Sequence, residues 1–204
     1  MPSRRTLARR LESVTDFAEP SVDLEQYLTP PDVAAHVLHF ASLQGDLTNR
    51  LVVDLGTGTG MFAIGASQFA PARVVGLDVD PEALTLARAN ERRVGGETPI
   101  DWVRGDAARP PLGVDSAIVL SNPPFGAQRR HADRPFLESA RALAAVSYTI
   151  HNEGSQSFVE SFAADHGGEV THAFRATFDL EHRFAFHAEA SRELEAEVFR
   201  IEWA

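Results

Sequence analysis

The stretch "RLVVDLGTGTG" (Arg50–Gly60) joins an apolar run to a loop rich in glycine. The run at 50–55 predicts a buried strand, and "GMFAIGASQFA" (60–70) predicts the helix that follows it. Glycine lets a backbone turn sharply and come close to a ligand, beside the electropositive N-terminus of a helix. This stretch therefore predicts the first strand, loop and helix of a nucleotide-binding α/β fold.

The rest of the chain continues this alternation of strands and helices. Predicted strands lie at 72–79, 100–103, 114–120 and 145–150, with helices at 80–93, 133–144 and 155–168. Such alternation is typical of a mostly parallel sheet with helices on both faces. The last two apolar runs, 169–180 and 192–203, have no helical pattern between them and predict an antiparallel hairpin.

Two helices are predicted before the first strand. One covers residues 3–14, and the other follows "LEQYLTPPD", where Thr29 is the expected N-cap and Pro30 the expected first helical residue. We interpret residues 1–204 as a single domain, in which 1–45 form a helical extension and a loop that covers the cofactor.

The composition limits the function classes and the compartment. The chain has 204 residues and a net charge of −10, with no Cys and no Lys, which excludes disulfides and thiolate zinc sites within it. An acidic surface without Lys suits a halophilic cytoplasm, although a codon bias towards Arg explains it equally well. No apolar run is long enough for a membrane span, so a soluble cytoplasmic protein is expected.

Acidic residues follow the second and third predicted strands at positions that suit a nucleoside. Asp78 comes some 20 residues after the glycine loop, where it could accept both hydroxyls of a ribose. Asp106 could accept the exocyclic amine of an adenine while the Ala107 N–H faces a ring nitrogen, or it could only begin a turn. Because the glycines also satisfy the G-x-G-x-x-G/A pattern, the loop alone leaves NAD open.

The fourth predicted strand ends in "SNPPF" (Ser121–Phe125), a rigid corner poor in backbone donors. A planar exocyclic amine is a poor nucleophile because its lone pair is delocalised. Two acceptors, the Asn122 side-chain oxygen and the Pro123 carbonyl, would bind its N–H groups, and Pro124 would help to fix them. Phe125 offers a face for stacking. This corner predicts methyl transfer to a planar amine or amide.

Several motifs together resemble the methyltransferase-like protein 5 family and its archaeal relatives. They are "LEQYLTPPDVAAHVL", "VVDLGTGTGMFAIGA", "GLDVDPEAL", "SNPPFGAQ", "DRPFLESA", "YTIHN" and "DLEHRFAFHAEASRELEAEVFRIEW". The resemblance implies a seven-stranded class I methyltransferase (Rossmann-like) sheet whose last strand is antiparallel. It also implies N6-methylation, from S-adenosyl-L-methionine, of an adenosine in small-subunit (16S) ribosomal RNA. A small zinc-binding activator protein is the implied partner. The strand at 100–103, with Trp102, could be the edge on which that partner docks, or equally an ordinary edge with a core tryptophan.

The resemblance implies roles for individual residues. Those expected at the cofactor are Gln26, Thr29, Asp54, Gly56, Gly58, Thr59, Gly60, Met61, Asp78, Asp106, Ala107 and Asn122. Asn122, Pro123, Pro124 and Phe125 are the expected catalytic residues, and no metal is expected. Candidate RNA contacts are Arg129, Arg130, Arg134 and His187, although a solvated loop explains the arginines as well.

Three other functions stay open at this point. The first is methylation of a glutamine side chain in a protein such as a release factor. The second is a cofactor-binding subunit whose site has decayed, and the third is a dehydrogenase. The intact "NPPF" and the aspartates after the strands argue against the last two.

Overall fold

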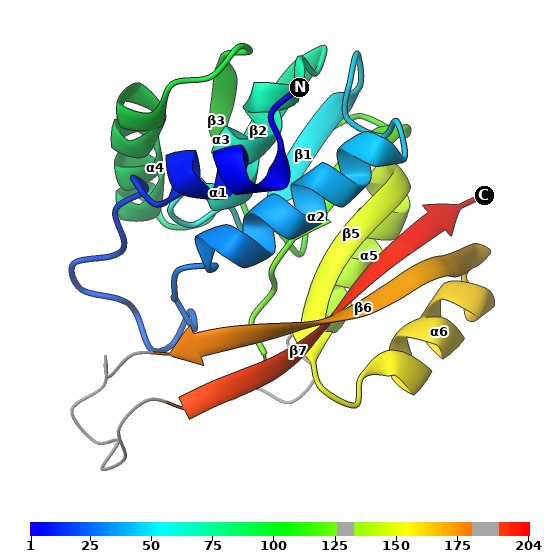
Figure 1. Cartoon of the computed structure of the whole chain (residues 1–204). Helices are drawn as coiled ribbons and strands as arrows, with labels where there is room; N and C mark the ends of the chain where they lie inside the picture. Colours follow the sequence, from blue (N-terminus) through cyan, green and yellow to red (C-terminus); the bar gives the residue numbers. More distant parts are fainter. Residues whose placement is uncertain (126–132, 181–191) are drawn as a thin grey trace.

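A computed structural model describes residues 1–125, 133–180 and 192–204 of the chain (Figure 1). In this part, seven strands form one sheet in the order β3-β2-β1-β4-β5-β7-β6. The strands are β1 (Leu51–Leu55), β2 (Arg73–Asp78), β3 (Ile100–Arg104), β4 (Ala117–Ser121), β5 (Ala144–Asn152), β6 (Gly168–Leu180) and β7 (Arg192–Trp203). The helices are α1 (Arg4–Leu11), α2 (Pro31–Leu43), α3 (Met61–Ala66), α4 (Pro81–Val94), α5 (Arg134–Leu143), α6 (Gln156–Asp165) and the short 3-10 helix η1 (Ser67–Phe69).

The sheet is parallel except for β7. Strands β3, β2, β1, β4 and β5 pair in parallel, and β7 pairs antiparallel with both β5 and β6. The predicted hairpin of the last two strands is therefore confirmed, as is the class I arrangement. Since β1 lies between β2 and β4, the order reverses at β1, where doubly wound sheets bind ligands beyond the carboxyl ends of their strands.

Side chains of the central strands alternate between two apolar layers. Val52 and Ile118 pack against α1, α2 and α3, whereas the neighbouring Val53 and Val119 pack towards α5. In Figure 1, α1 and α2 lie across the front of the sheet. This period of two is what a sheet covered on both faces requires. The predicted α/β layering is confirmed.

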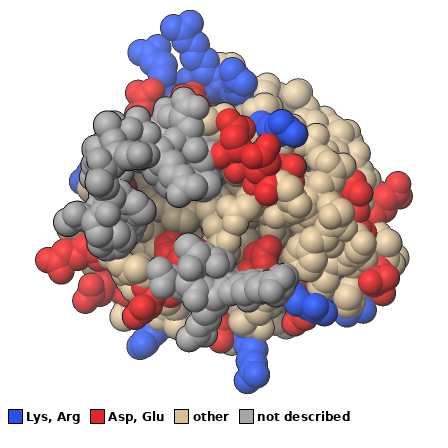
Figure 2. All heavy atoms as spheres, turned by 90° about the horizontal axis from the view of Figure 1, so that it is seen from below, with Lys and Arg blue, Asp and Glu red and all other residues tan. Residues whose placement is uncertain are grey.

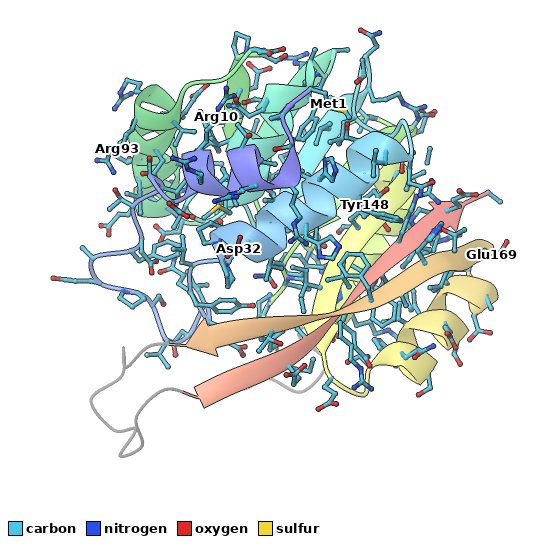
Figure 3. The ribbon with its side chains drawn as sticks, viewed as in Figure 1. Met1, Arg10, Asp32, Arg93, Tyr148 and Glu169 are labelled. Atoms are coloured by element: carbon cyan, nitrogen blue, oxygen red, sulfur yellow. The ribbon has the colours of Figure 1, made fainter. Side chains whose placement is uncertain are left out.

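A buried polar cluster joins α2 to the far half of the sheet. The Arg200 Nε donates to Asp46 Oδ2 over 2.9 Å, and the Tyr148 hydroxyl donates to the same oxygen over 2.5 Å. Figure 3 labels Tyr148 between α2 and β5, and Asp32 at the start of α2. The cluster fixes the end of α2 over β5 and β7.

The start of α2 corrects one prediction. Thr29 was expected to cap this helix, but the helix begins at Pro31 with Pro30 as its N-cap, and no side chain caps it. A residue before proline is disfavoured in the helical region, so Pro30 stays extended with ψ 136°. The Thr29 hydroxyl is used elsewhere, in the site described below. The next long helix, α4, does have a side-chain cap, since Asp80 accepts from the Glu82 N–H.

None of the helices in residues 1–125, 133–180 and 192–204 is long and apolar enough to cross a membrane.

Candidate active site

The loop between β1 and α3 has three glycines in the left-handed region, so its backbone is not covered by side chains of its own. Gly56, Gly58 and Gly60 have φ of 70°, 52° and 87°, which L side chains rarely adopt. A Cβ on Gly56 would lie 3.0 Å from the Phe136 ring, and one on Gly58 would lie 3.3 Å from the Phe17 ring. Glycine is therefore needed here both for the turn and for the space above it.

Asp54, the penultimate residue of β1, fixes this loop through hydrogen bonds of its side chain. Its Oδ2 accepts a hydrogen bond from the Thr57 hydroxyl over 2.6 Å and another from the Ala63 N–H over 3.0 Å. The side chain is buried, and burial raises the pKa of Asp54 to about 7, with Asp78 adding to the rise. Both bonds of Asp54 go to the loop and to α3, so it sets the shape of the loop.

Asp78, the last residue of β2, lies directly beside the loop. Its Oδ2 accepts from the Gly58 N–H over 2.8 Å and its Oδ1 from the Asp80 N–H over 3.0 Å. Burial raises the pKa of Asp78. A carboxylate has about four acceptor positions, so both oxygens can still accept the hydroxyls of a ribose. Gln26 lines the pocket next to Asp78, where its Nε2 donates to Asp80 Oδ2 over 2.7 Å.

Asp106 follows β3 and begins a turn. Its Oδ1 accepts from the Ala108 N–H over 2.9 Å, and its carbonyl accepts from the Arg109 N–H. Part of the carboxylate therefore serves the turn, one of the two roles the sequence left open. Asp106 and the buried Ala107 also line the pocket beside Asp78, where Oδ2 could accept an exocyclic amine.

Asn122 directly follows β4, and both the nitrogen and the oxygen of its side-chain amide are hydrogen-bonded to the loop before α2. Its Nδ2 donates to the Thr29 hydroxyl over 3.0 Å, and its Oδ1 accepts from the Tyr27 hydroxyl over 3.0 Å. The Tyr27 ring is stacked on Phe125, with centroids 5.3 Å apart and planes 27° from parallel. The N-terminal loop thus meets the Asn-Pro-Pro-Phe corner at two residues.

The end of β5 fixes the same corner from the other side. Asn152 donates from Nδ2 to the Phe125 carbonyl over 2.6 Å. The buried His151 bonds to the Thr149 hydroxyl through Nε2, at 2.9 Å, and to Asp133 Oδ2 through Nδ1, at 2.8 Å. Because Asp133 is the N-cap of α5, β5 fixes both Phe125 and the start of that helix.

One pocket of about 580 Å³ gathers these residues. Predicted residues that line it are Gln26, Thr29, Asp54, Gly56, Gly58, Thr59, Met61, Asp78, Asp106, Ala107, Asn122 and Pro124. Gly60, Pro123 and Phe125 lie next to it but are not among its lining residues. Figure 2 views the end of the molecule to which the parallel strands point, where Asp and Glu occur near the middle and Arg towards the outline.

The predicted RNA contacts are only partly described. Arg134, at the start of α5, is exposed and pairs with Glu138 one turn later, with 3.2 Å between Nε and Oε1. Arg129, Arg130 and His187 lie outside the described residues. In the described ranges, no three His, Asp or Glu side chains are grouped as ligands of a metal ion.

Three aromatic residues of the site were missed by sequence reasoning. Phe17 and Phe136 line the pocket beside the glycine loop, and Tyr27 is stacked on Phe125 of the Asn-Pro-Pro-Phe corner. Phe17 is in an irregular segment without a periodic pattern, so nothing in the sequence pointed to it. Tyr27 had a signal, since it lies between Gln26 and Thr29, both of which were expected at the cofactor.

The pocket fits S-adenosylmethionine. Its volume is within the range of about 300–1,000 Å³ that small-molecule sites occupy. The space above Gly56 and Gly58 would be filled by any larger residue, and acceptors that suit a ribose and an adenine amine follow β2 and β3. Gln26, Gly58, Asp78, Asp106 and Ala107 are the residues that would hold it.

Comparison with known proteins agrees with this geometry. The family model described as "Methyltransferase small domain" matches residues 30–146. An uncharacterized protein of Methanocaldococcus jannaschii is 36% identical; the match covers 99% of this chain and 95% of that protein. The rRNA N6-adenosine-methyltransferase Mettl5 of Drosophila melanogaster is 32% identical, over 97% of this chain and 95% of its own.

A solved structure agrees over the whole fold. The crystal structure of a candidate RNA methyltransferase from Pyrococcus horikoshii superimposes with a TM-score of 0.90 at 34% identity, covering 100% of this chain and 99% of that one. The chain belongs to the methyltransferase small domain family and, within it, to the methyltransferase-like protein 5 family, and it is an enzyme whose cofactor is S-adenosylmethionine.

Proposed function

We propose that this enzyme methylates the exocyclic N6 amine of an adenosine in ribosomal RNA. The observation that carries the proposal is the corner at the end of β4, where the Asn122 amide is oriented by Thr29 and Phe125 is held by Asn152. Three fixed groups, an amide oxygen, a carbonyl and an aromatic face, match what a planar amine requires. The names of the fly and zebrafish relatives, both rRNA N6-adenosine-methyltransferases, support the same substrate class.

The residues of the corner would act on the amine of the target base. Asn122 Oδ1 and the Pro123 carbonyl would each accept one of its N–H groups, which favours a tetrahedral nitrogen with an available lone pair. When bound, S-adenosylmethionine supplies an electrophilic methyl group. Prolines at 123 and 124 keep the acceptors in place, so little reorganisation is needed during the reaction. The proton can leave after methyl transfer, and no strong general base is required.

The target base would have to leave its stack to reach this corner. Enzymes that act on a base inside a helix extrude the nucleotide into a pocket and read its Watson–Crick edge. Stacking on Phe125 would contribute about 1–3 kcal/mol to holding such a base. Arg129, Arg130, Arg134 and His187 are our candidates for contacts with the flanking phosphates.

We further propose small-subunit (16S) RNA as the acceptor and a small zinc-binding activator protein as the partner. Strand β3 is an edge of the sheet and so offers backbone groups for pairing with another chain. Its Trp102 faces inward instead: Nε1 donates to Glu91 Oε2 of α4 over 2.7 Å. The backbone of β3, rather than its tryptophan, is the docking element we propose. Residues 1–204 would act as one domain, with 1–45 covering the cofactor.

The test measures transfer of labelled methyl groups from S-adenosylmethionine to RNA. Small-subunit RNA from a strain that lacks the gene is the acceptor, and the enzyme is assayed alone and after co-expression with the activator. The digested RNA should contain labelled N6-methyladenosine, and Asn122→Ala should reduce the label by more than about 100-fold, since removing one oriented acceptor at a reacting centre costs that much.

Two controls make the result specific. Gln44→Ala removes an exposed amide at the end of α2, away from the pocket, and should retain full activity. Asn122→Ala loses two hydrogen bonds and should unfold at a somewhat lower temperature, but a cooperative unfolding transition well above the assay temperature shows that the variant is folded. Label in a protein, with none in RNA even when the activator is present, would contradict the proposal and favour glutamine methylation.

A further inference from the structure

We propose that Tyr27 occupies the place of the target base in the free enzyme and leaves it when the base enters. The inference rests on the proposed function, because it concerns the corner assigned to the adenine amine. Tyr27 makes the two contacts that this amine-bearing ring would make: its hydroxyl donates to Asn122 Oδ1 at 3.0 Å, and its ring stacks on Phe125.

The likeness of the two contacts is chemical as well as geometric. A phenol and an aminopurine are both flat rings with an exocyclic donor group in the ring plane, one O–H in the phenol and two N–H in the amine. Burial, the larger effect, raises the pKa of Tyr27 well above its usual value, so the hydroxyl stays protonated and acts as the donor to Asn122. The amide oxygen of Asn122 cannot be the donor in this bond, and the amide nitrogen is bonded to Thr29.

The surroundings of Tyr27 allow such a movement. Tyr27 lies in the irregular segment between α1 and α2, outside any strand or helix; its ring packs against the core, while part of the residue stays exposed to solvent. Two residues earlier, Glu25 has a φ of 49°, an unfavourable conformation for a residue with a side chain. Thr29, in contrast, is buried and bonded to Asn122 Nδ2, so the amide keeps its orientation when Tyr27 moves.

The consequence is competition between Tyr27 and the acceptor. If the base must displace Tyr27, only enzyme molecules with an empty corner can bind the base. The apparent Kd for the base is then the intrinsic Kd divided by the fraction of enzyme whose corner is empty. Removing the hydroxyl alone weakens the occupied state by about one net hydrogen bond and leaves the ring in place. Tyr27→Phe should therefore lower the KM for RNA by about fivefold, with kcat changed by less than about twofold.

The kinetic test has a matched control. Tyr148, the second of the two tyrosines in the chain, donates to Asp46 in the buried cluster behind α2. Tyr148→Phe should lower the unfolding temperature and leave the KM for RNA as it is. A higher KM, or a kcat reduced about tenfold, in Tyr27→Phe would overturn the proposal and assign the hydroxyl to substrate positioning or chemistry.

A second measurement follows Tyr27 directly. Because the chain has two tyrosines, incorporation of 3-fluorotyrosine gives two ¹⁹F resonances, which Tyr27→Phe assigns. S-adenosylhomocysteine fills the cofactor site, and adenosine is then added. The Tyr27 resonance should move while that of Tyr148 stays. Purine riboside, which stacks but lacks the amine, should move the Tyr27 resonance only at several-fold higher concentration.

The two proposals fail in different ways. If the parent enzyme methylates RNA while saturating adenosine leaves the Tyr27 resonance unchanged, Tyr27 is a fixed wall and this inference is wrong. If no adenine is methylated in any RNA, the proposed function is wrong, whatever the resonance does.

Discussion

Replacing Asp54 by Asn should remove a pH dependence of stability that the glycine loop imposes on the fold. Asp54 is 2% exposed and has a pKa of about 7 in the folded chain, against about 3.9 in an unfolded one. The folded state therefore favours the protonated carboxyl. Its contribution to stability is fully present below the unfolded pKa and is lost as the pH rises through the folded pKa.

The size of the effect follows from the separation of the two pKa values. Between them, each pH unit lowers the free energy of unfolding by about 1.4 kcal/mol, and above about pH 7 the effect levels off. From about pH 5 to about pH 8 the parent chain should lose about 2.5 kcal/mol relative to Asp54→Asn, which does not titrate. Asp78 and the other carboxyls are common to both chains, so their titration largely cancels in the difference.

Urea unfolding of the cofactor-free chains, followed by tryptophan fluorescence, measures this difference. Asp101→Asn is the matched control, because Asp101 is half exposed and paired with Arg73 at the surface, and it should show no such trend. If the difference between the parent and Asp54→Asn stays constant within about 0.5 kcal/mol over this pH range, the argument from burial is refuted.

Three further substitutions test other parts of the structure. Asp78→Asn should weaken S-adenosylmethionine binding by about 10- to 100-fold in calorimetry, since hydrogen bonds to a charged acceptor are lost, and an unchanged Kd would contradict the ribose assignment. Gly60→Ala, at φ 87° and with a Cβ 2.9 Å from a tryptophan ring, should cost about 2 kcal/mol in denaturant unfolding, whereas Gly113→Ala, with open space around it, should cost nothing. Asp46→Ala should cost about 3 kcal/mol, because the buried Arg200 guanidinium loses one of its two carboxylate partners and keeps only Glu202, while the Tyr148 hydroxyl loses its acceptor; a loss below about 1 kcal/mol would show that Glu202 and water compensate.

The sheet and the cofactor loop could be predicted because they depend on local patterns. Alternating strands and helices imply parallel pairing, and glycines with positive φ leave a direct mark in the sequence. Asp78 was singled out from its spacing, and its carboxylate lies beside the loop, bonded to the Gly58 N–H. These features need no knowledge of which distant residues meet.

The contacts around Asn122 could not be predicted, because they join segments far apart in the chain. Tyr27 and Thr29 are 95 and 93 residues away from the amide they bond. Thr29 was wrongly predicted to cap α2, because a threonine hydroxyl next to a helix start can either accept from the helix backbone or bond to a distant side chain, here that of Asn122. The strand predicted at 145–150 continues to Asn152, and its two additional polar residues, His151 and Asn152, hold the corner.

The position of β7 has a consequence for the order in which the protein can fold during synthesis. In the chain β6 precedes β7, yet in the sheet β7 lies between β5 and β6, so β6 has no strand to pair with until β7 has been made. Until then β5 presents an open edge whose backbone groups could pair with another chain. A nascent chain that stalls before β7 would thus have its glycine loop and its Asn-Pro-Pro-Phe corner but an incomplete sheet, and it would be prone to aggregate.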